Sequence, residues 1–280
     1  MSHTPKTPTP SYTTANLPTD LPEGSVVFDS SLQKLVSFKL GSWGTLGGVG
    51  STTYVRDNVA GVIDQIQGDI PEDWKKTDTS LKGLVIGTSC TSIGDSAFRF
   101  CSGLTGSLVI PDSVTTIGSY AFDGCSGFDG TLTLPNTIEN IRRSAFDSCS
   151  GLTGPLNIPD SVTFIDDYTF NGCSSLTGSL TIPNSVTKVG VQAFADCSSL
   201  TGTLTIPNSI LSAFGHSAFK NCSGLNNVDC YVEKSFLDVS SCLLGTSVTT
   251  IHVRSTDSTW TAGAGQTIGG KTGIEVIKDL

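Results

Sequence analysis

The feature that most constrains this chain is a 24-residue period. Phenylalanine, cysteine and proline each recur at this spacing in a common register: Phe98, Phe122, Phe146, Phe170 and Phe194; Cys101, Cys125, Cys149, Cys173 and Cys197; Pro111, Pro135, Pro159, Pro183 and Pro207. A fixed period of this length is typical of a supersecondary unit that stacks on copies of itself until a continuous core forms. The period therefore predicts a solenoid, mostly of β structure.

One copy shows how each turn is built. Leu180 and Ile182 alternate with polar residues, which predicts a short strand with one buried face. Pro183 follows and ends the strand, because proline has no backbone N–H to donate. Val186 and Phe194 are expected to line the rest of the interior, with the phenylalanine as the largest apolar group of the turn.

These residues resemble the BspA-like leucine-rich repeats, whose pattern is close to I-P-x-S-V-T-x-I-G-x-x-A-F-x-x-C-S-x-L. The matching stretches are Ile110 to Phe128, Leu134 to Leu152, Ile158 to Leu176, Ile182 to Leu200 and Ile206 to Leu225. The resemblance covers residues 81–253. It implies a leucine-rich repeat solenoid that serves adhesion and surface recognition without catalysis.

The copies differ at the two ends of the array. Interior copies have a four-residue step between recurring leucines because they contain an extra glycine, as in Leu104 to Leu108, whereas the end copies have a three-residue step. Atypical end copies are expected to cap the stack. Inward strands are predicted near residues 84, 108, 132, 156, 180, 204, 228 and 251, which gives about eight turns.

Charge and hydropathy exclude some partners. The formal net charge is −9 and there is no Lys/Arg cluster, which argues against binding to nucleic acid. No apolar run reaches the ~18 residues of a membrane span. The first ten residues contain no apolar stretch, so we expect no ordinary secretory signal in the sequence.

The nine cysteines do not have the spacing of ligands or of a disulfide framework. Most occupy one repeat position and are expected to form a ladder of buried, structural thiols, with no metal and no cofactor. One disulfide, between Cys230 and Cys242 in the irregular C-terminal turns, remains an alternative to be tested.

The residues before the solenoid divide into three segments. Residues 1–20 are rich in proline and threonine and predict an extended arm. Residues 21–56 predict a β-hairpin around Asp29, followed by a Gly-rich linker, and residues 21–43 resemble the short β elements near the base of phage tail fibres and other virion proteins. Residues 57–80 predict a helix that caps the first turn, because apolar residues there recur at helical spacing. Residues 254–280 are expected to form a C-terminal cap.

No catalytic group is predicted. His3 lies in the N-terminal arm, and His216 replaces a polar residue of a repeat. His252 alternates with inward residues and is expected to face outward, so no Ser/His/Asp or Cys/His set can be argued. A ladder of Asp and Asn follows the prolines, and these residue types are the favoured turn formers: Asp112, Asn136, Asp160, Asn184 and Asn208. We therefore expect that the protein is not an enzyme.

The outward side of the predicted strands is the candidate binding surface. We call it the strand face and define it by Thr131, Thr133, Asn157, Ser179, Thr181, Thr203 and Thr205. It is uncharged and rich in hydroxyl groups, which offer donors and acceptors to a glycan or a protein loop. Threonine is also a good strand former, so a passive face is an alternative.

Two kinds of surface protein fit this organisation. The primary hypothesis is a non-catalytic virion component, of phage tail-fibre, head-fibre or decoration type. It would contact other virion proteins through residues 1–50 and a host-surface glycan or protein through the solenoid. The alternatives are a bacterial cell-surface or secreted BspA-like adhesin and an intracellular repeat scaffold. Homo-oligomerisation is left open.

Overall fold

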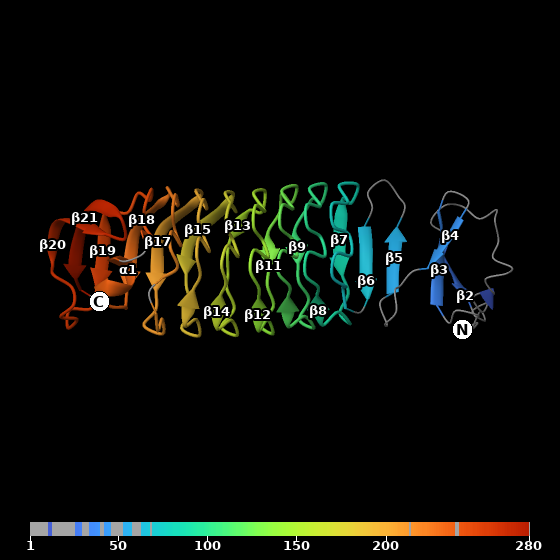
Figure 1. Cartoon of the computed structure of the whole chain (residues 1–280), viewed down its shortest axis with the longest axis horizontal. Coiled ribbons are helices and arrows are strands. Elements are labelled where there is room, and N and C mark those ends of the chain that lie inside the picture. The colour runs from blue at the N-terminus through green and yellow to red at the C-terminus, as the bar shows by residue number, and fades with distance from the viewer. Residues whose placement is uncertain are drawn as a thin grey trace, which may run out of the picture.

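The computed structural model is an elongated stack of turns along one axis, seen from the side in Figure 1. It describes residues 69–212, 214–238 and 241–279, together with the strand segments 11–12, 26–29, 34–39, 42–45, 53–57 and 63–67. The predicted β solenoid of about eight turns is confirmed.

One strand of each turn joins a parallel array that we call the front ladder. Its strands are β7 (Gly83–Ile86), β9 (Leu108–Val109), β11 (Leu132–Thr133), β13 (Gly154–Pro155), β15 (Leu176–Thr181), β17 (Leu200–Ile206), β18 (Leu225–Cys230) and β19 (Thr250–Val253). The inward residues are in register where the longer strands pair, with Leu180 opposite Leu204 and Val228 opposite Ile251. The predicted inward positions therefore lie on these strands or directly beside them.

The extra glycines of the interior copies act as bulges. The register of the front ladder shifts between Gly178 and Leu180 and again between Gly202 and Thr203. Gly178 has a φ of 81° and Gly202 a φ of 74°, a backbone conformation that is costly for residues with a Cβ. The glycine thus absorbs the fourth residue of the step, so the following leucine still points inward.

A second parallel array, which we call the back ladder, was not predicted as strands. It consists of β8 (Ser92–Ile93), β10 (Thr116–Ile117), β12 (Asn140–Ile141), β14 (Phe164–Ile165) and β16 (Lys188–Val189). The second residue of each strand is buried in the core. Each strand has only two residues, which is too short for an alternating pattern to be recognised in the sequence.

The recurring phenylalanines form a continuous stack inside the coil. Rings of successive turns, from Phe98 to Phe219, lie nearly parallel with centroids 5.1 to 5.6 Å apart. Trp74 meets the first ring edge-on at 5.4 Å and covers the N-terminal end of the stack. The phenylalanine rings are fully buried and hold neighbouring turns together by apolar burial and by ring contact.

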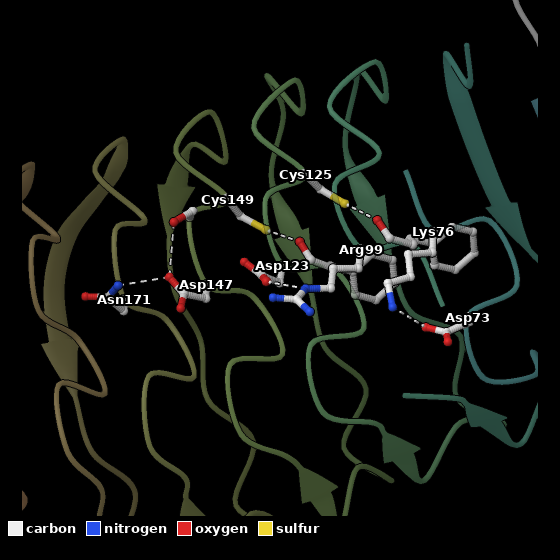
Figure 2. Close-up of polar contacts among 11 residues, drawn as sticks. Asp73, Lys76, Arg99, Asp123, Cys125, Asp147, Cys149 and Asn171 are labelled. Carbon is white, nitrogen blue, oxygen red and sulfur yellow. Dashed lines mark hydrogen bonds and ion pairs between the residues drawn. The ribbon is translucent and has the colours of Figure 1, made fainter. Parts of the chain in front are cut away.

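The recurring cysteines are structural thiols, as predicted. Each interior thiol donates a hydrogen bond to the backbone carbonyl of the phenylalanine one turn earlier, as Cys125 does to Phe98 and Cys149 does to Phe122, both at 3.0 Å (Figure 2). Cys173 donates to Phe146 in the same way at 3.1 Å. All nine cysteines are buried thiols, and Cys230 and Cys242, whose disulfide was left open, are not joined to each other by a disulfide. Burial raises the pKa of the Cys222 and Cys230 thiols to about 12, which makes them poor nucleophiles.

The predicted capping helix at residues 57–80 is wrong. This segment contains the end of β5 (Thr53–Asp57) and β6 (Ile63–Gln67), which pair with each other, and β6 pairs in parallel with β7. The outer edge of β7 presents unpaired backbone groups that a strand can satisfy and a helix cannot. Hydrogen bonding to β7 therefore stabilises a strand in this segment, although a few of its apolar residues have helical spacing.

The solenoid therefore begins before residue 81. Ile70 forms a parallel bridge with Ile93 of the back ladder, and Trp74 takes the place that phenylalanine holds in the following turns. The strand β6 and residues 69–86 thus make an irregular first turn.

The predicted N-terminal hairpin is present. β2 (Val26–Asp29) pairs antiparallel with β3 (Lys34–Lys39), β4 (Ser42–Thr45) extends the sheet, and β1 (Ser11–Tyr12) adds a parallel strand. Residues 11 and 12 of the predicted arm therefore join this sheet. The rest of the arm lies outside the described residues.

The C-terminal end is closed by a second hairpin. β21 (Lys271–Lys278) continues the front ladder in parallel beside β19, and β20 (Gly263–Ile268) pairs antiparallel with β21. The short helix α1 (Lys234–Asp238) precedes this cap. Trp260 is buried and its indole N–H donates to the carbonyl of Val232 at 2.9 Å, which ties the cap to the preceding turn.

Candidate ligand-binding face

The structure brings the predicted residues of the strand face onto neighbouring turns of the front ladder. Leu132 is buried whereas Thr131 and Thr133 on either side of it are exposed, as the alternation of a strand requires. Across the ladder, Thr181 lies directly opposite Thr205. Five of the seven residues are exposed, and Thr203 and Thr205 are half-buried.

The chemistry of the outward positions changes along the array. Near its start, Val85 and Val109 are 43% and 55% exposed and give an apolar surface. The strand face follows, where hydroxyl groups predominate and no residue is charged. Beyond it, His252 Nδ1 lies 2.9 Å from the carboxylate of Asp279. The strand face is therefore the uncharged, hydrogen-bonding middle of a graded surface.

Two grooves lie where the front-ladder strands end. The N-terminal groove has a volume of about 650 Å³ and is lined by Val109, Pro111, Asp112, Thr133, Leu134 and Asn136, among others. The C-terminal groove has a volume of about 490 Å³ and is lined by Asp160, Thr181, Asn184, Thr205, Asn208, Tyr231 and Arg254, with Ile182, Pro183 and Pro207. The turn-forming Asp and Asn residues thus line the grooves, and three members of the strand face extend into them.

Sequence reasoning missed Tyr231 and Arg254. Each directly follows a front-ladder strand, at the position that proline holds in the earlier turns. The guanidinium of Arg254 lies 5.5 Å from the centroid of the Tyr231 ring. The signal in the sequence was the break in the proline register at these two positions.

A separate row of polar side chains links turns beside the phenylalanine stack (Figure 2). The Arg99 Nε donates to the Asp123 carboxylate at 2.8 Å, and the Asn171 amide donates to Asp147 at 2.9 Å. Burial raises the pKa of Asp123, and the nearby Asp147 carboxylate adds to the rise, whereas the Arg99 hydrogen bond opposes it. These carboxylates already have protein partners, so we assign the row a structural role.

The two histidines in the described part of the chain, His216 and His252, do not assemble a catalytic group. His216 Nδ1 lies 2.8 Å from the Ser217 hydroxyl, but Ser217 is only 2% exposed and cannot meet a substrate. Within the described part of the chain, no cluster of His, Cys, Asp and Glu has the makings of a metal site.

None of the helices that the structure describes has the length and apolar character needed to cross a membrane.

The repeating turns, the phenylalanine stack and the front ladder define a leucine-rich repeat solenoid. The chain belongs to the BspA type leucine rich repeat region family, whose model matches residues 72–155 and 154–262 in six copies.

Several solved structures are similar to the chain. A leucine rich cell surface protein from Faecalibacterium prausnitzii is 18% identical, with 83% of this chain and 94% of that chain covered and a TM-score of 0.37. A leucine-rich repeat protein from Bacteroides ovatus is 17% identical (74% and 70% covered, TM-score 0.36), and the leucine-rich repeat protein of T. pallidum is 21% identical (74% and 84% covered, TM-score 0.37). No curated protein matches the chain.

Proposed function

We propose that this protein is a non-catalytic recognition protein that is displayed on a surface and binds its ligand through the strand face. The observation that carries the proposal is the strand face itself, an uncharged row of hydroxyl and amide side chains on neighbouring turns. Such groups donate and accept hydrogen bonds without the desolvation penalty of a charge. The rigid core beneath them preorganises their positions, which lowers the entropic cost of binding.

The bacterial cell surface is the location that the family favours. What the BspA-like resemblance implies is adhesion at surfaces, and the family assignment covers most of the solenoid. In this proposal the front ladder faces the partner and the two end caps protect the stack from pairing with other chains.

A virion is the second candidate location. The observation that favours it is the separate sheet of β1 to β4 ahead of the solenoid, in the segment that resembles the base of phage fibres. In this case residues 1–50 would attach to other virion proteins and the solenoid would contact the host.

Fractionation distinguishes the two locations. The protein is quantified by mass spectrometry in the cell envelope and medium of the producing bacterium and in purified phage particles from the same culture. Enrichment in particles supports the virion, and enrichment in envelope or medium without particles supports the adhesin. Recovery only from the cytoplasm would contradict display and support the intracellular scaffold.

Binding to whole cells tests the strand face. The strand-face variant of the full chain carries lysine in place of three exposed threonines: Thr131, Thr133 and Thr181. The matched control carries three lysines at exposed positions off this face: Ser126, Thr163 and Ser198. Both variants gain the same charge, so loss of binding in the first variant alone supports the strand face. Equal binding by both variants would exclude it.

A further inference from the structure

The C-terminal groove differs from the rest of the array in one respect. Pro207, Tyr231 and Arg254 follow successive strands, because Ile206 lies opposite Cys230 and Cys230 lies opposite Val253. The prolines that follow the front-ladder strands of the earlier turns are therefore replaced by an aromatic ring and a guanidinium. Both side chains are half-buried, and both also line a neighbouring hollow together with Glu233, Asp257 and Thr259, among others.

The polar side chains of this groove have unused hydrogen-bonding capacity. With respect to the residues that the structure describes, the side chains of Asp160, Asn184, Asn208 and Tyr231 have no hydrogen-bond partner. Within the described part of the chain, the Arg254 guanidinium lies over the Tyr231 ring and has no hydrogen bond or ion pair. Together with the hydroxyls of the strand face, these groups present donors and acceptors side by side along one groove.

We propose that the C-terminal groove binds a neutral oligosaccharide, with one sugar ring packed against Tyr231 and its hydroxyls bonded to Asn208 and Arg254. A sugar ring has an apolar C–H face and a rim of hydroxyls that both donate and accept. A tyrosine offers the matching apolar surface and polar tip, and carboxamides and hydroxyls match the rim. This proposal rests on the proposed function and names the ligand class of its C-terminal end.

The charges around the groove favour a neutral ligand. Asp160 lies at one end, Glu233 and Asp257 line the hollow beside Arg254, and the whole chain carries a net charge of −9. These carboxylates would repel a polyanion, and the single guanidinium of Arg254 cannot compensate for their charge. Arg254 is therefore assigned to hydrogen bonding with hydroxyls and not to pairing with a carboxylate.

The length of the groove fits several sugar units. The lining residues follow the turns of β13 to β19, and at ~4.8 Å between paired strands these four steps span roughly 19 Å. An extended chain of pyranose rings repeats at a distance close to that between neighbouring turns. The hydroxyl and amide groups of successive turns, Thr181 with Asn184 and Thr205 with Asn208, can therefore meet successive sugar units.

Isothermal titration calorimetry with the full chain tests the proposal. The probes are tetrasaccharides of glucose, mannose, galactose and N-acetylglucosamine, with tetragalacturonate as an acidic control and a neutral Ser/Thr-rich peptide as a polypeptide control. We expect at least one neutral tetrasaccharide to bind. Tyr231→Ala should weaken that binding on the order of tenfold, and Asn208→Ala, at an exposed position, by roughly three- to tenfold.

The matched control is Tyr168→Ala. Tyr168 is also half-buried and also lies under an arginine, with Arg143 5.2 Å from its ring centroid, but it is outside the groove. Binding that is unchanged in this variant and lost in Tyr231→Ala supports the groove. Absence of binding to all the neutral tetrasaccharides, tighter binding of the acid or the peptide, or equal loss in both tyrosine variants would overturn the proposal. The whole-cell experiment tests the strand face independently of the ligand class. If the ligand were a protein, the lysine variant would still bind cells less, although no tetrasaccharide bound in calorimetry.

Discussion

The phenylalanine stack predicts a large and local effect of one substitution in its middle. Phe146 is fully buried and stacks on Phe122 and on Phe170, with centroids 5.5 Å away on both sides. Phe146→Ala removes the buried ring and leaves a cavity, which costs about 3–5 kcal/mol of unfolding free energy. Phe146→Leu keeps most of the apolar volume but loses both ring contacts, and each contact contributes about 0.5–1.5 kcal/mol. We therefore expect it to cost about 1–3 kcal/mol.

The assay is urea unfolding followed by circular dichroism, combined with native-state hydrogen exchange read by mass spectrometry. In a solenoid each turn contacts only its neighbours, so a weak interface should lower protection mainly in the adjoining turns. The reporting amides are those of Phe122 and Phe146, which bond to the carbonyls of the following turns at 2.8 and 2.9 Å.

Leu211→Ala is the control for this prediction. Leu211 is 76% exposed, so its loss should change stability by no more than about 0.5 kcal/mol. A cost below about 1 kcal/mol for Phe146→Ala would show that the rings are not packed as a continuous stack. A loss of protection spread evenly over all turns would refute the local coupling.

Three further predictions concern polar contacts, pH and turn spacing. Arg99→Ala should cost about 1–3 kcal/mol because it leaves a buried carboxylate without its partner, whereas Arg143→Ala, whose ion pair is long and half-exposed, should cost less than about 1 kcal/mol in the same urea assay. Burial raises the pKa of the Cys101 thiol to about 11 and raises those of the interior thiols as well, so stability should be constant below the unfolded thiol pKa near 9 and fall as pH rises beyond it; unfolding curves that coincide from pH 8 to pH 10.5 would contradict this. Gly118→Ala should destabilise by about 1–3 kcal/mol because its Cβ would lie 2.6 Å from a backbone nitrogen of the preceding turn, whereas Gly106→Ala meets no atom within 4 Å and should cost only about 1 kcal/mol for its positive φ; equal melting temperatures for the two variants would refute the steric reasoning.

The interior of the solenoid could be predicted from the sequence because its residues repeat. Leu180, Phe194 and Cys197 each have counterparts one period away, and a side chain that must contact its own copy leaves a strong periodic signal. The free, buried state of the cysteines followed from the same reasoning, since thiols stacked singly offer no paired ligands.

The structure of the N-terminal end could not be predicted, because it depends on hydrogen bonding to the edge strand of the first turn, which the local sequence pattern does not reveal. The segment at 63–67 has helical spacing, yet it pairs with β7 to satisfy the backbone groups of the first turn. No other repeat has a tryptophan at the position of Trp74. Only its distance of one period from Phe98 would have identified it as the residue that covers the end of the phenylalanine stack.

Departures from the period fall into two kinds, which burial distinguishes. Inside the coil, Leu243 and Thr246 occupy the phenylalanine and cysteine positions of the turn after Phe219 and Cys222. Both are buried, and the Thr246 hydroxyl donates to the carbonyl of Leu243 at 2.8 Å. The polar group introduced there has its hydrogen-bond partner within the protein, so these two departures serve the closure of the core. Tyr231 and Arg254 depart from the period on the outside, where their polar groups find no hydrogen-bond partner among the described residues. In a repeat protein, an outward departure with unused hydrogen-bonding groups is the position at which a ligand is expected, and this reasoning places the C-terminal groove ahead of the uniform threonines as the first site to mutate.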